Sequence, residues 1–199
     1  MNALEQVKSH LQEGKVYRRA DLERWSNAVD RHLSQLQQAG VLMKLSGGLY
    51  YRPKMTVFGA APADDETLVE AFLKDHRFLL TSPNLYSALG LGMTQLYNET
   101  VVYNHTRHGL FRLGGRTFRF VMKPHFPVKP TLEFLLVDVV NNLDQLAEDR
   151  EQALKQVQNK ARSMDKDALA KAAQEYGGVR ARKFFSKALA DDTLQYARP

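Results

Sequence analysis

Three polar side chains in the first part of the sequence have the types and the spacing needed to read DNA bases. Asn27, Arg31 and Gln35 recur at every fourth position, which places them on one face of an α-helix. Arg can bind guanine through O6 and N7, and Asn or Gln can bind adenine through N6 and N7. An ordinary solvated helix face is also polar, so the interpretation depends on the elements that surround these residues.

Those surrounding elements favour DNA binding. A short helix, a turn, a second helix and a β-hairpin are expected in that order, which is typical of a winged helix-turn-helix; this module places its second helix in the major groove. Ser26 is the expected N-cap of the second helix, and Gly47 and Gly48 supply the positive φ of the hairpin turn. The expected elements are a helix at 20–25, a turn at 26–27, a helix from there to 40, and strands at 41–45 and 49–52.

The predicted hairpin carries residues that suit contacts with the DNA backbone. Lys44, Ser46 and Arg52 could bind phosphate or enter the minor groove as a wing. Asp30 lies between the apolar and polar faces of the second helix, and it would repel phosphate if it faced the groove. The sequence therefore predicts both a base-reading helix and a backbone-contacting wing.

A second basic surface is expected near the middle of the chain. Residues 100–130 contain no acidic side chain, and a hairpin is expected around Gly114 and Gly115 with Arg112 opposite Thr117. Phe111, Leu113, Phe118 and Phe120 would form its apolar face. The opposite face could bind backbone phosphate or RNA, or it could be a solvated face whose charges discourage edge pairing. The residues of the expected basic patch are Arg107, Arg112, Arg116, Arg119 and Lys123, and Lys129 is the sixth basic residue of this region.

Length and composition allow one large domain or two small ones. The 199 residues carry a formal net charge of +6, and 44% of them are hydrophobic, as in ordinary soluble globular proteins. We expect an α+β fold in which a winged helix-turn-helix precedes a mixed domain with a small antiparallel sheet and a C-terminal helical bundle. The expected segments are a DNA-binding domain at 1–53, a linker at 54–65 and a second domain at 66–199, with a β-hairpin region at 100–123 and helices over 131–190.

No group of residues is arranged for catalysis, metal binding or cofactor binding. The absence of Cys excludes a disulfide framework and a thiolate zinc site. His105 and His108 would point to opposite faces of a strand, so we expect no metal site with His125. No phosphate-binding loop, dinucleotide fingerprint or nucleophile with a matching base is present. We therefore expect a protein that is not an enzyme and that has no cofactor.

The sequence also gives an expectation for the cellular compartment. The N-terminus has no apolar signal core. The longest apolar stretch, 134–140, is interrupted by Asp138 and is too short to span a bilayer. Together with the lack of Cys, these features lead us to expect a cytoplasmic protein with no membrane partner.

The middle of the chain resembles the AbiEi family of antitoxins from bacterial abortive-infection toxin–antitoxin systems. That family combines an N-terminal winged helix with a domain that has an A-x-x-L-G-L-x-x-Q core, a Y-x-T-type strand and a basic hairpin. The resemblance extends over residues 15 to 125 and includes the wing sequence G-V-L-M-K-L-S-G-G-L-Y-Y-R-P. The positions that carry it elsewhere are Ala88, Leu89, Gly90, Leu91, Gln95, Tyr103, Thr106, Leu113, Gly114, Gly115, Arg116, Phe118 and Phe120.

The resemblance implies a type IV antitoxin that also represses its own operon. Such a protein binds inverted repeats in double-stranded promoter DNA, and it counters a nucleotidyltransferase toxin without forming a stable complex with it. In that family the N-terminal domain is linked to repression and the C-terminal domain to antitoxicity and cooperative DNA binding, and the resemblance implies a second basic patch at Arg112, Arg116 and Arg119. The implied DNA-binding residues are Arg18, Arg19, Ser26, Asn27, Ala28, Arg31, Gln35, Lys44, Ser46 and Arg52.

Two alternatives remain open at this point. The chain could be a winged-helix transcriptional regulator unrelated to toxins. It could also be an interaction protein that inhibits a neighbouring enzyme and uses the winged helix for protein contact. An operon without a nucleotidyltransferase gene would favour the first alternative, and a stable stoichiometric complex without DNA binding would favour the second.

Overall fold

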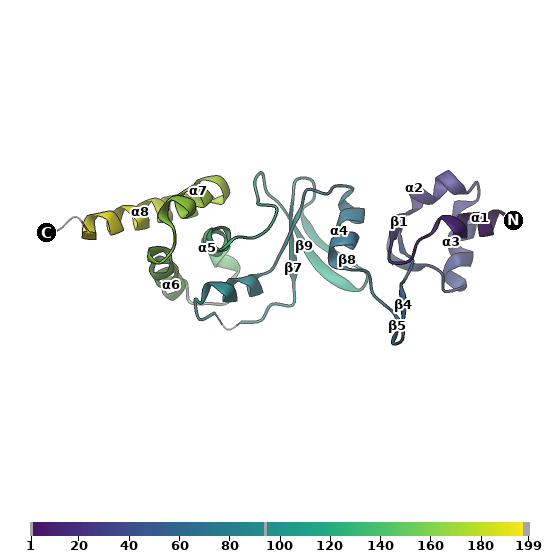
Figure 1. The fold of residues 1–199 in the computed structure, drawn as a ribbon, viewed down its shortest axis with the longest axis horizontal. Helices are drawn as coiled ribbons and strands as arrows, with labels where there is room; N and C mark the ends of the chain where they lie inside the picture. The colour runs from purple at the N-terminus through teal and green to yellow at the C-terminus, as the bar shows by residue number, and fades with distance from the viewer. Residues whose placement is uncertain (1, 94, 197–199) are drawn as a thin grey trace. The chain divides into compact units, whose positions relative to one another are not determined.

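The structure is a computed structural model that describes residues 2–93 and 95–196. The chain has the expected α+β fold, with helices and small antiparallel sheets (Figure 1). It divides into two compact units. The first contains Met1–His76 and Thr106–Phe120, and the second contains Arg77–His105 and Val121–Pro199. No helix of the described residues is both long enough and apolar enough to cross a membrane.

The first unit begins with the expected helices and hairpin, and it contains one further strand that pairs with the hairpin. Strand β1 pairs antiparallel with β3, and β3 pairs antiparallel with β2, which gives the sheet order β1-β3-β2. The elements in chain order are α1 (Ala3–His10), β1 (Val16–Arg18), α2 (Arg19–Leu22), η1 (Glu23–Trp25), α3 (Val29–Gln38), β2 (Met43–Ser46) and β3 (Leu49–Tyr51).

The apolar positions of these helices meet in one small core. Val7 of α1, Leu22 of α2 and Leu33 of α3 are almost completely buried against each other. The turn between β2 and β3 contains Gly48 with φ of +71°, a conformation that Gly adopts without strain. Tyr50 and Tyr51 are neighbours on β3 and point to opposite faces of the strand, and both are buried, so both faces of this short strand are covered.

The predicted N-cap of the second helix is wrong by two residues. Ser26 does not cap α3; its Oγ accepts a hydrogen bond from the Ala28 N–H at 3.1 Å and lies 2.7 Å from Nδ1 of the buried His32. Ala28 occupies the N-cap position, and α3 begins at Val29 and ends at Gln38, before the predicted end at 40. The helix starts late because the Ser26 side chain stabilises the turn instead of the helix end.

The predicted linker contains a small hairpin, and the two units divide elsewhere. Strands β4 (Met55–Thr56) and β5 (Gly59–Ala60) pair within 54–65. The next helix, α4 (Asp65–Leu73), belongs to the first unit, as do β8 (Gly109–Leu113) and most of β9 (Arg116–Met122). Hydrogen bonds join these later elements to the first 53 residues: the Gly114 N–H donates to the Leu45 carbonyl at 3.0 Å.

The β8–β9 hairpin has the predicted register. Leu113 lies opposite Arg116, Arg112 opposite Thr117, and Phe111 opposite Phe118. The turn residues Gly114 and Gly115 have φ of +55° and +82°, as a two-residue hairpin turn requires. Phe118 and Phe120 are completely buried, and the rings of Phe111 and Phe120 pack against Phe72 of α4. The expected apolar face of the hairpin is confirmed.

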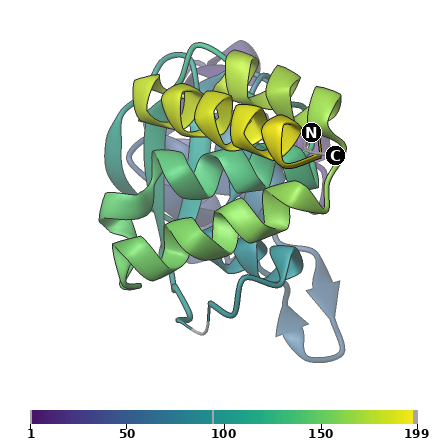
Figure 2. The ribbon, with the colours of Figure 1, turned by 90° about the vertical axis from the view of Figure 1, so that its left-hand side faces the viewer.

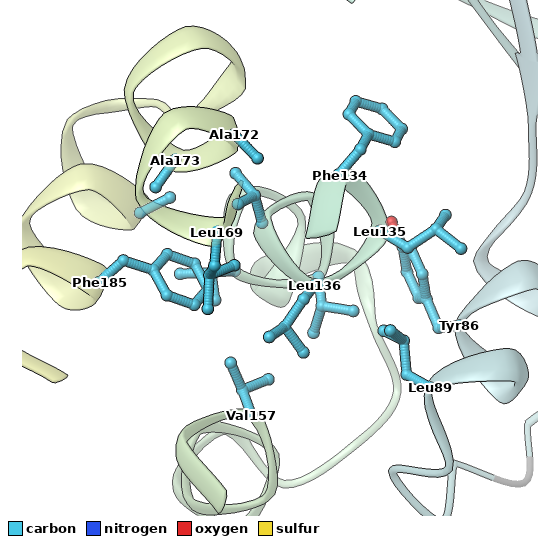
Figure 3. Close-up of a cluster of buried hydrophobic side chains, with 14 of the residues drawn as sticks. Tyr86, Leu89, Phe134, Leu135, Leu136, Val157, Leu169, Ala172, Ala173 and Phe185 are labelled. Carbon is cyan, nitrogen blue, oxygen red and sulfur yellow. The ribbon is translucent and has the colours of Figure 1, made fainter. Parts of the chain in front are cut away.

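The second unit is a helical layer built around one apolar helix. Helix α5 contacts α6, α7 and α8, and it lies between α6 and α8 in Figure 2. All residues of α5 from Phe134 to Val140 are buried, and Figure 3 shows Leu135, Leu136 and their neighbours in this core. The elements are β6 (Leu79–Thr81), η2 (Pro83–Leu89), β7 (Thr100–Asn104), α5 (Leu132–Asn141), η3 (Leu143–Gln145), α6 (Arg150–Arg162), α7 (Lys166–Tyr176) and α8 (Val179–Tyr196).

The helical region expected over 131–190 is thus present as separate helices. Each of α5, α6 and α7 begins with an acceptor side chain at its N-cap, where Thr and Asp are favoured because they satisfy free N–H groups of the first turn. Thr131, Asp149 and Asp165 accept hydrogen bonds from these backbone N–H groups. Strand β6 pairs antiparallel with β7, with Leu80 opposite Val102.

Candidate nucleic-acid interface

Helix α3 exposes the polar face that the sequence predicted. Val29, Leu33 and Leu36 are buried on one side, whereas Arg31 and Gln35 are exposed on the other and lie one turn apart. Within the described part of the chain, neither of these two side chains has a hydrogen-bond or ion-pair partner. Both are therefore available to bind a partner without breaking an internal contact.

The only acidic residue of α3 is already paired. Nε and Nη2 of Arg19 each lie 2.7 Å from a different carboxylate oxygen of Asp30, and Arg19 also pairs with Glu23. The hydrogen bonds that Arg19 donates hold the pKa of Asp30 below its usual range, and the acceptance of these bonds by Asp30 and Glu23 raises the pKa of Arg19. Asp30 thus keeps its negative charge, but the bidentate contact compensates it.

The turn before α3 presents only part of the predicted base-reading set. Asn27 is exposed, but it precedes the helix and does not continue the four-residue series of Arg31 and Gln35 along its axis. Ser26 is half-buried and bonded within the turn, and Ala28 is the N-cap residue. Of these three, Asn27 alone offers an exposed side chain that could donate and accept hydrogen bonds.

The predicted wing residues have different roles in the structure. Lys44 is exposed on β2, and Ser46 is half-buried beside a register shift between these two residues. Arg52 donates from Nη1 to the Leu11 carbonyl at 2.6 Å, so it ties β3 to the end of α1. Lys44 remains the residue of this hairpin that is best placed to meet a phosphate.

Arg18 also has a structural role. Its Nε donates to the carbonyl of Ala71 in α4 at 2.7 Å, and its backbone N–H donates to Asp21 at 2.9 Å. The guanidinium group therefore joins β1 to α4 within the first unit. Binding of phosphate by Arg18 would require this contact to break or to be shared.

The second basic patch is not a set of equivalent free cations. Arg116 pairs with Asp65 at 2.5 Å and also donates to the Ala63 carbonyl. Arg107 lies over the ring of Phe72, 4.7 Å from its centre. Lys123 belongs to the second unit, whereas the four arginines of the predicted patch belong to the first.

Two further residues of that patch lie on the exposed strand face. Arg112 is exposed, and no described residue pairs with its guanidinium group. Arg119 is half-buried and makes a contact of its own. Arg112 is therefore the arginine of the β8–β9 hairpin that is most available to a polyanion.

One exposed basic residue near α3 was not predicted from the sequence. Arg24 is exposed on η1, directly before the turn, and it has no internal partner within the described residues. Arg24 directly precedes Trp25, and this neighbour was the signal that the sequence offered for it. Trp25 is half-buried and stacks on His10.

No group of His, Cys, Asp and Glu residues in the described chain could hold a metal ion.

Comparison with known proteins gives a likeness of fold. No family model matches the chain, and no curated protein matches it. The structure is similar to the crystal structure of the RV2827C protein from Mycobacterium tuberculosis, with a TM-score of 0.56 and 16% sequence identity. The match covers 96% of this chain and 77% of that chain.

Proposed function

We propose that this protein binds double-stranded DNA through α3 of its first unit. The observation that carries the proposal is the exposed pair Arg31 and Gln35, which have no internal partner among the described residues, on a helix whose single acid is paired with Arg19. Their side chains suit guanine and adenine edges in the major groove. The fold likeness supports the α+β architecture only.

We interpret the first unit as a winged helix-turn-helix. In this interpretation α2 and α3 form the helix-turn-helix, α3 is the recognition helix, and the β2–β3 hairpin is the wing, with Lys44 on the phosphate backbone. Asn27 and Arg24 would flank the recognition helix on its N-terminal side. Arg18 and Arg52 would stabilise the fold of the module and would not contact the DNA, because each donates a hydrogen bond to a backbone carbonyl.

The biological role that we propose is that of a type IV antitoxin and autorepressor. This part of the proposal rests on the resemblance of the sequence to AbiEi antitoxins. It implies operator DNA with inverted repeats, a cytoplasmic location, and a nucleotidyltransferase toxin that is countered without a stable complex. Arg112 would then provide a second contact with nucleic acid.

The test is a mobility-shift assay of the full chain with the promoter of its own operon and with random DNA of equal length. We expect preference for the promoter and a steep fall in affinity with salt, because phosphate contacts release counterions. Arg31→Ala should weaken discrimination by about 1–3 kcal/mol. Equal affinity for both DNAs at every salt concentration would refute specific binding.

The antitoxin role needs a separate test. The gene that follows this one would be expressed alone and together with this protein, and growth would be measured. We expect growth arrest in the first case and rescue in the second, with no complex after co-purification. A stoichiometric complex in the absence of DNA binding would instead favour a protein-interaction inhibitor.

A further inference from the structure

A cavity of about 440 Å³ lies in the second unit beside the turn that joins α7 to α8. Lys123 and His125, which follow β9, line it together with Arg182 of α8. Within the described chain, the side chains of His125 and Arg182 have no hydrogen-bond or ion-pair partner. Glu175 is the acidic residue of the lining. Lys123 and Arg182 thus bring two cations to the lining from separate segments, against one acid in the lining; Asp138, which pairs with Lys123, is buried and does not line the cavity.

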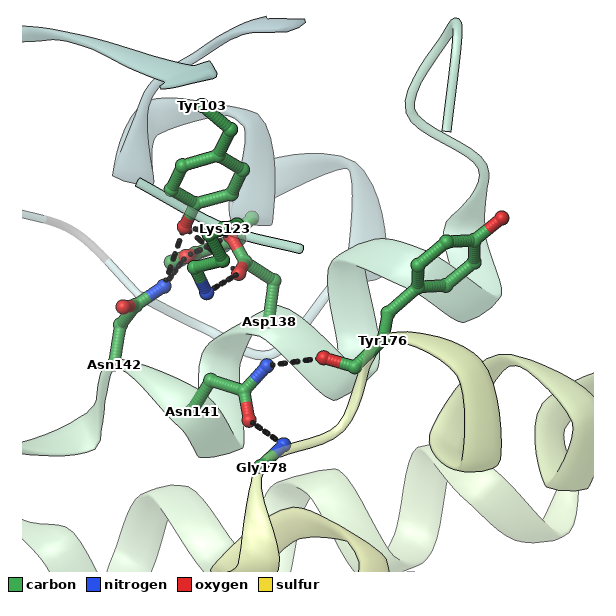
Figure 4. Close-up of polar contacts among 8 residues, drawn as sticks. Tyr103, Lys123, Asp138, Asn141, Asn142, Tyr176 and Gly178 are labelled. Atoms are coloured by element: carbon green, nitrogen blue, oxygen red, sulfur yellow. Dashed lines mark hydrogen bonds and ion pairs between the residues drawn. The ribbon is translucent and has the colours of Figure 1, made fainter. Parts of the chain in front are cut away.

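A buried acid pairs with the head group of Lys123, one of the lining residues. Nζ of Lys123 lies 3.6 Å from Oδ1 of Asp138 and 4.3 Å from the centre of the Tyr103 ring. Figure 4 shows this ammonium group next to the carboxylate of Asp138. The two contacts restrict the position of the head group, which carries three N–H donors.

Asp138 itself is fixed from the opposite side. It is 1% exposed, and it accepts hydrogen bonds from Tyr86 at 2.9 Å and from Tyr103 at 2.8 Å. A buried carboxylate is costly unless hydrogen bonds and a cation compensate it. Asp138, in the apolar helix α5, therefore fixes the position of the Lys123 head group in the absence of a ligand.

The turn between α7 and α8 is also fixed. Asn141 donates from Nδ2 to the Tyr176 carbonyl at 3.0 Å and accepts from the Gly178 N–H at 2.8 Å (Figure 4). A Cβ atom at Gly177 would lie 2.3 Å from the Ala173 carbonyl oxygen, so only Gly fits there. The first turn of α8 begins directly after these residues, and its positive end lies at the same cavity.

From this geometry we propose that the cavity binds the phosphate group of a phosphomonoester. Lys123 and Arg182 supply charge-assisted hydrogen bonds to the phosphate oxygens, and His125 supplies a ring N–H. A volume of about 440 Å³ falls in the range of small-molecule sites. The phosphate could belong to a free nucleotide or to the 5′ end of a nucleic acid. The site uses residues of the second unit only and does not depend on the proposed DNA interface.

The test is titration of the isotope-labelled full chain with inorganic phosphate, followed by NMR and calorimetry. Backbone N–H signals of 177–182 should shift on binding. Arg182→Ala and His125→Ala should each lower the affinity about tenfold or more, the loss expected for one hydrogen bond to a charged group. Lys183→Ala is the matched control, because Lys183 is exposed on α8 next to Arg182 but does not line the cavity.

Further arms of the experiment identify the source of the phosphate. AMP is compared with adenosine, and a 5′-phosphorylated tetranucleotide is compared with its 5′-hydroxyl form. Tighter binding of AMP supports a free nucleotide, and tighter binding of the phosphorylated tetranucleotide supports a nucleic-acid end. The proposal is overturned if phosphate leaves the signals of 177–182 unchanged, or if Lys183→Ala lowers the affinity as much as Arg182→Ala does.

Discussion

Replacing Tyr103 with Phe should destabilise the second unit by removing one hydroxyl group from the buried cluster around Asp138. This hydroxyl donates to the carboxylate, with its oxygen 2.8 and 3.0 Å from the two carboxylate oxygens. It also accepts from Nδ2 of Asn142 at 3.0 Å. The ring stays in place, so the change deletes the polar contacts and leaves the apolar packing almost intact.

The expected magnitude follows from the charge and burial of the acceptor. A hydrogen bond to a charged group contributes about 1.5–3 kcal/mol, and Nδ2 of Asn142 also loses one of its two hydroxyl acceptors, while it keeps the Tyr86 hydroxyl at 3.1 Å. We therefore expect Tyr103→Phe to lower the free energy of unfolding of the second unit by about 2–3 kcal/mol. Tyr97→Phe is the matched control: the Tyr97 hydroxyl accepts from the Ala147 N–H at 3.0 Å at an exposed site, so its removal should cost below about 1 kcal/mol.

The assay has to separate the two units. Trp25 is the single Trp of the sequence and lies in the first unit, so its fluorescence reports on that unit alone. Hydrogen exchange of the α5 amides under native conditions reports on the second. Wild-type protection of the α5 amides in Tyr103→Phe, or an equal loss of protection in Tyr97→Phe, would show that the Tyr103 hydroxyl does not stabilise this unit.

Three more predictions follow from the same contacts. Burial raises the pKa of Asp138 above its usual range, so the folded state binds the proton of this carboxyl group more tightly than the unfolded state does. The free energy of unfolding should therefore fall as pH rises above about 4 and through the folded-state pKa. Asp138→Asn should flatten this part of a plot of unfolding free energy against pH. Arg19→Ala should weaken DNA binding at low salt because it exposes the charge of Asp30, and adding Asp30→Asn should restore most of the lost affinity in a mobility shift; no recovery in the double variant would contradict the role of this pair. Leu136→Ala, at a fully buried position, should lower the unfolding free energy by about 2–5 kcal/mol in the hydrogen-exchange assay. A smaller loss would mean that α6 or α8 moves to fill the space left by the leucine side chain.

Local patterns predicted the parts of the fold in which neighbouring residues decide the geometry. The β8–β9 register was predictable because Gly114-Gly115 fixes a two-residue turn, and the turn fixes every pairing that follows. The apolar and polar faces of α3 were predictable from helical spacing. The start of α3 was not, because Ser26 bonds to His32, six residues away, in preference to the helix end.

Contacts between distant segments decided the rest. Nothing near Arg18 or Arg52 in the sequence shows that their partners are the carbonyls of Ala71 and Leu11. The division into units was unpredictable for the same reason, since residues 106–120 belong to the first unit although residues 77–105, which precede them, belong to the second. Asp138 did leave a signal, because an acid inside an apolar run of a helix needs a buried partner, but its partners Tyr86 and Tyr103 follow only from the folded structure.

We propose that the exposed face of α3 reads DNA bases. The most direct measurement is selection of bound sequences from a random double-stranded library by the wild-type full chain, Arg31→Ala and Gln35→Ala, with Lys15→Ala as an exposed charge-loss control outside α3. We predict that the wild type and Lys15→Ala enrich the same motif, and that each α3 variant loses preference at one position of it, by about 1–3 kcal/mol. An unchanged motif in both α3 variants, or no enrichment by the wild type, would contradict the claim.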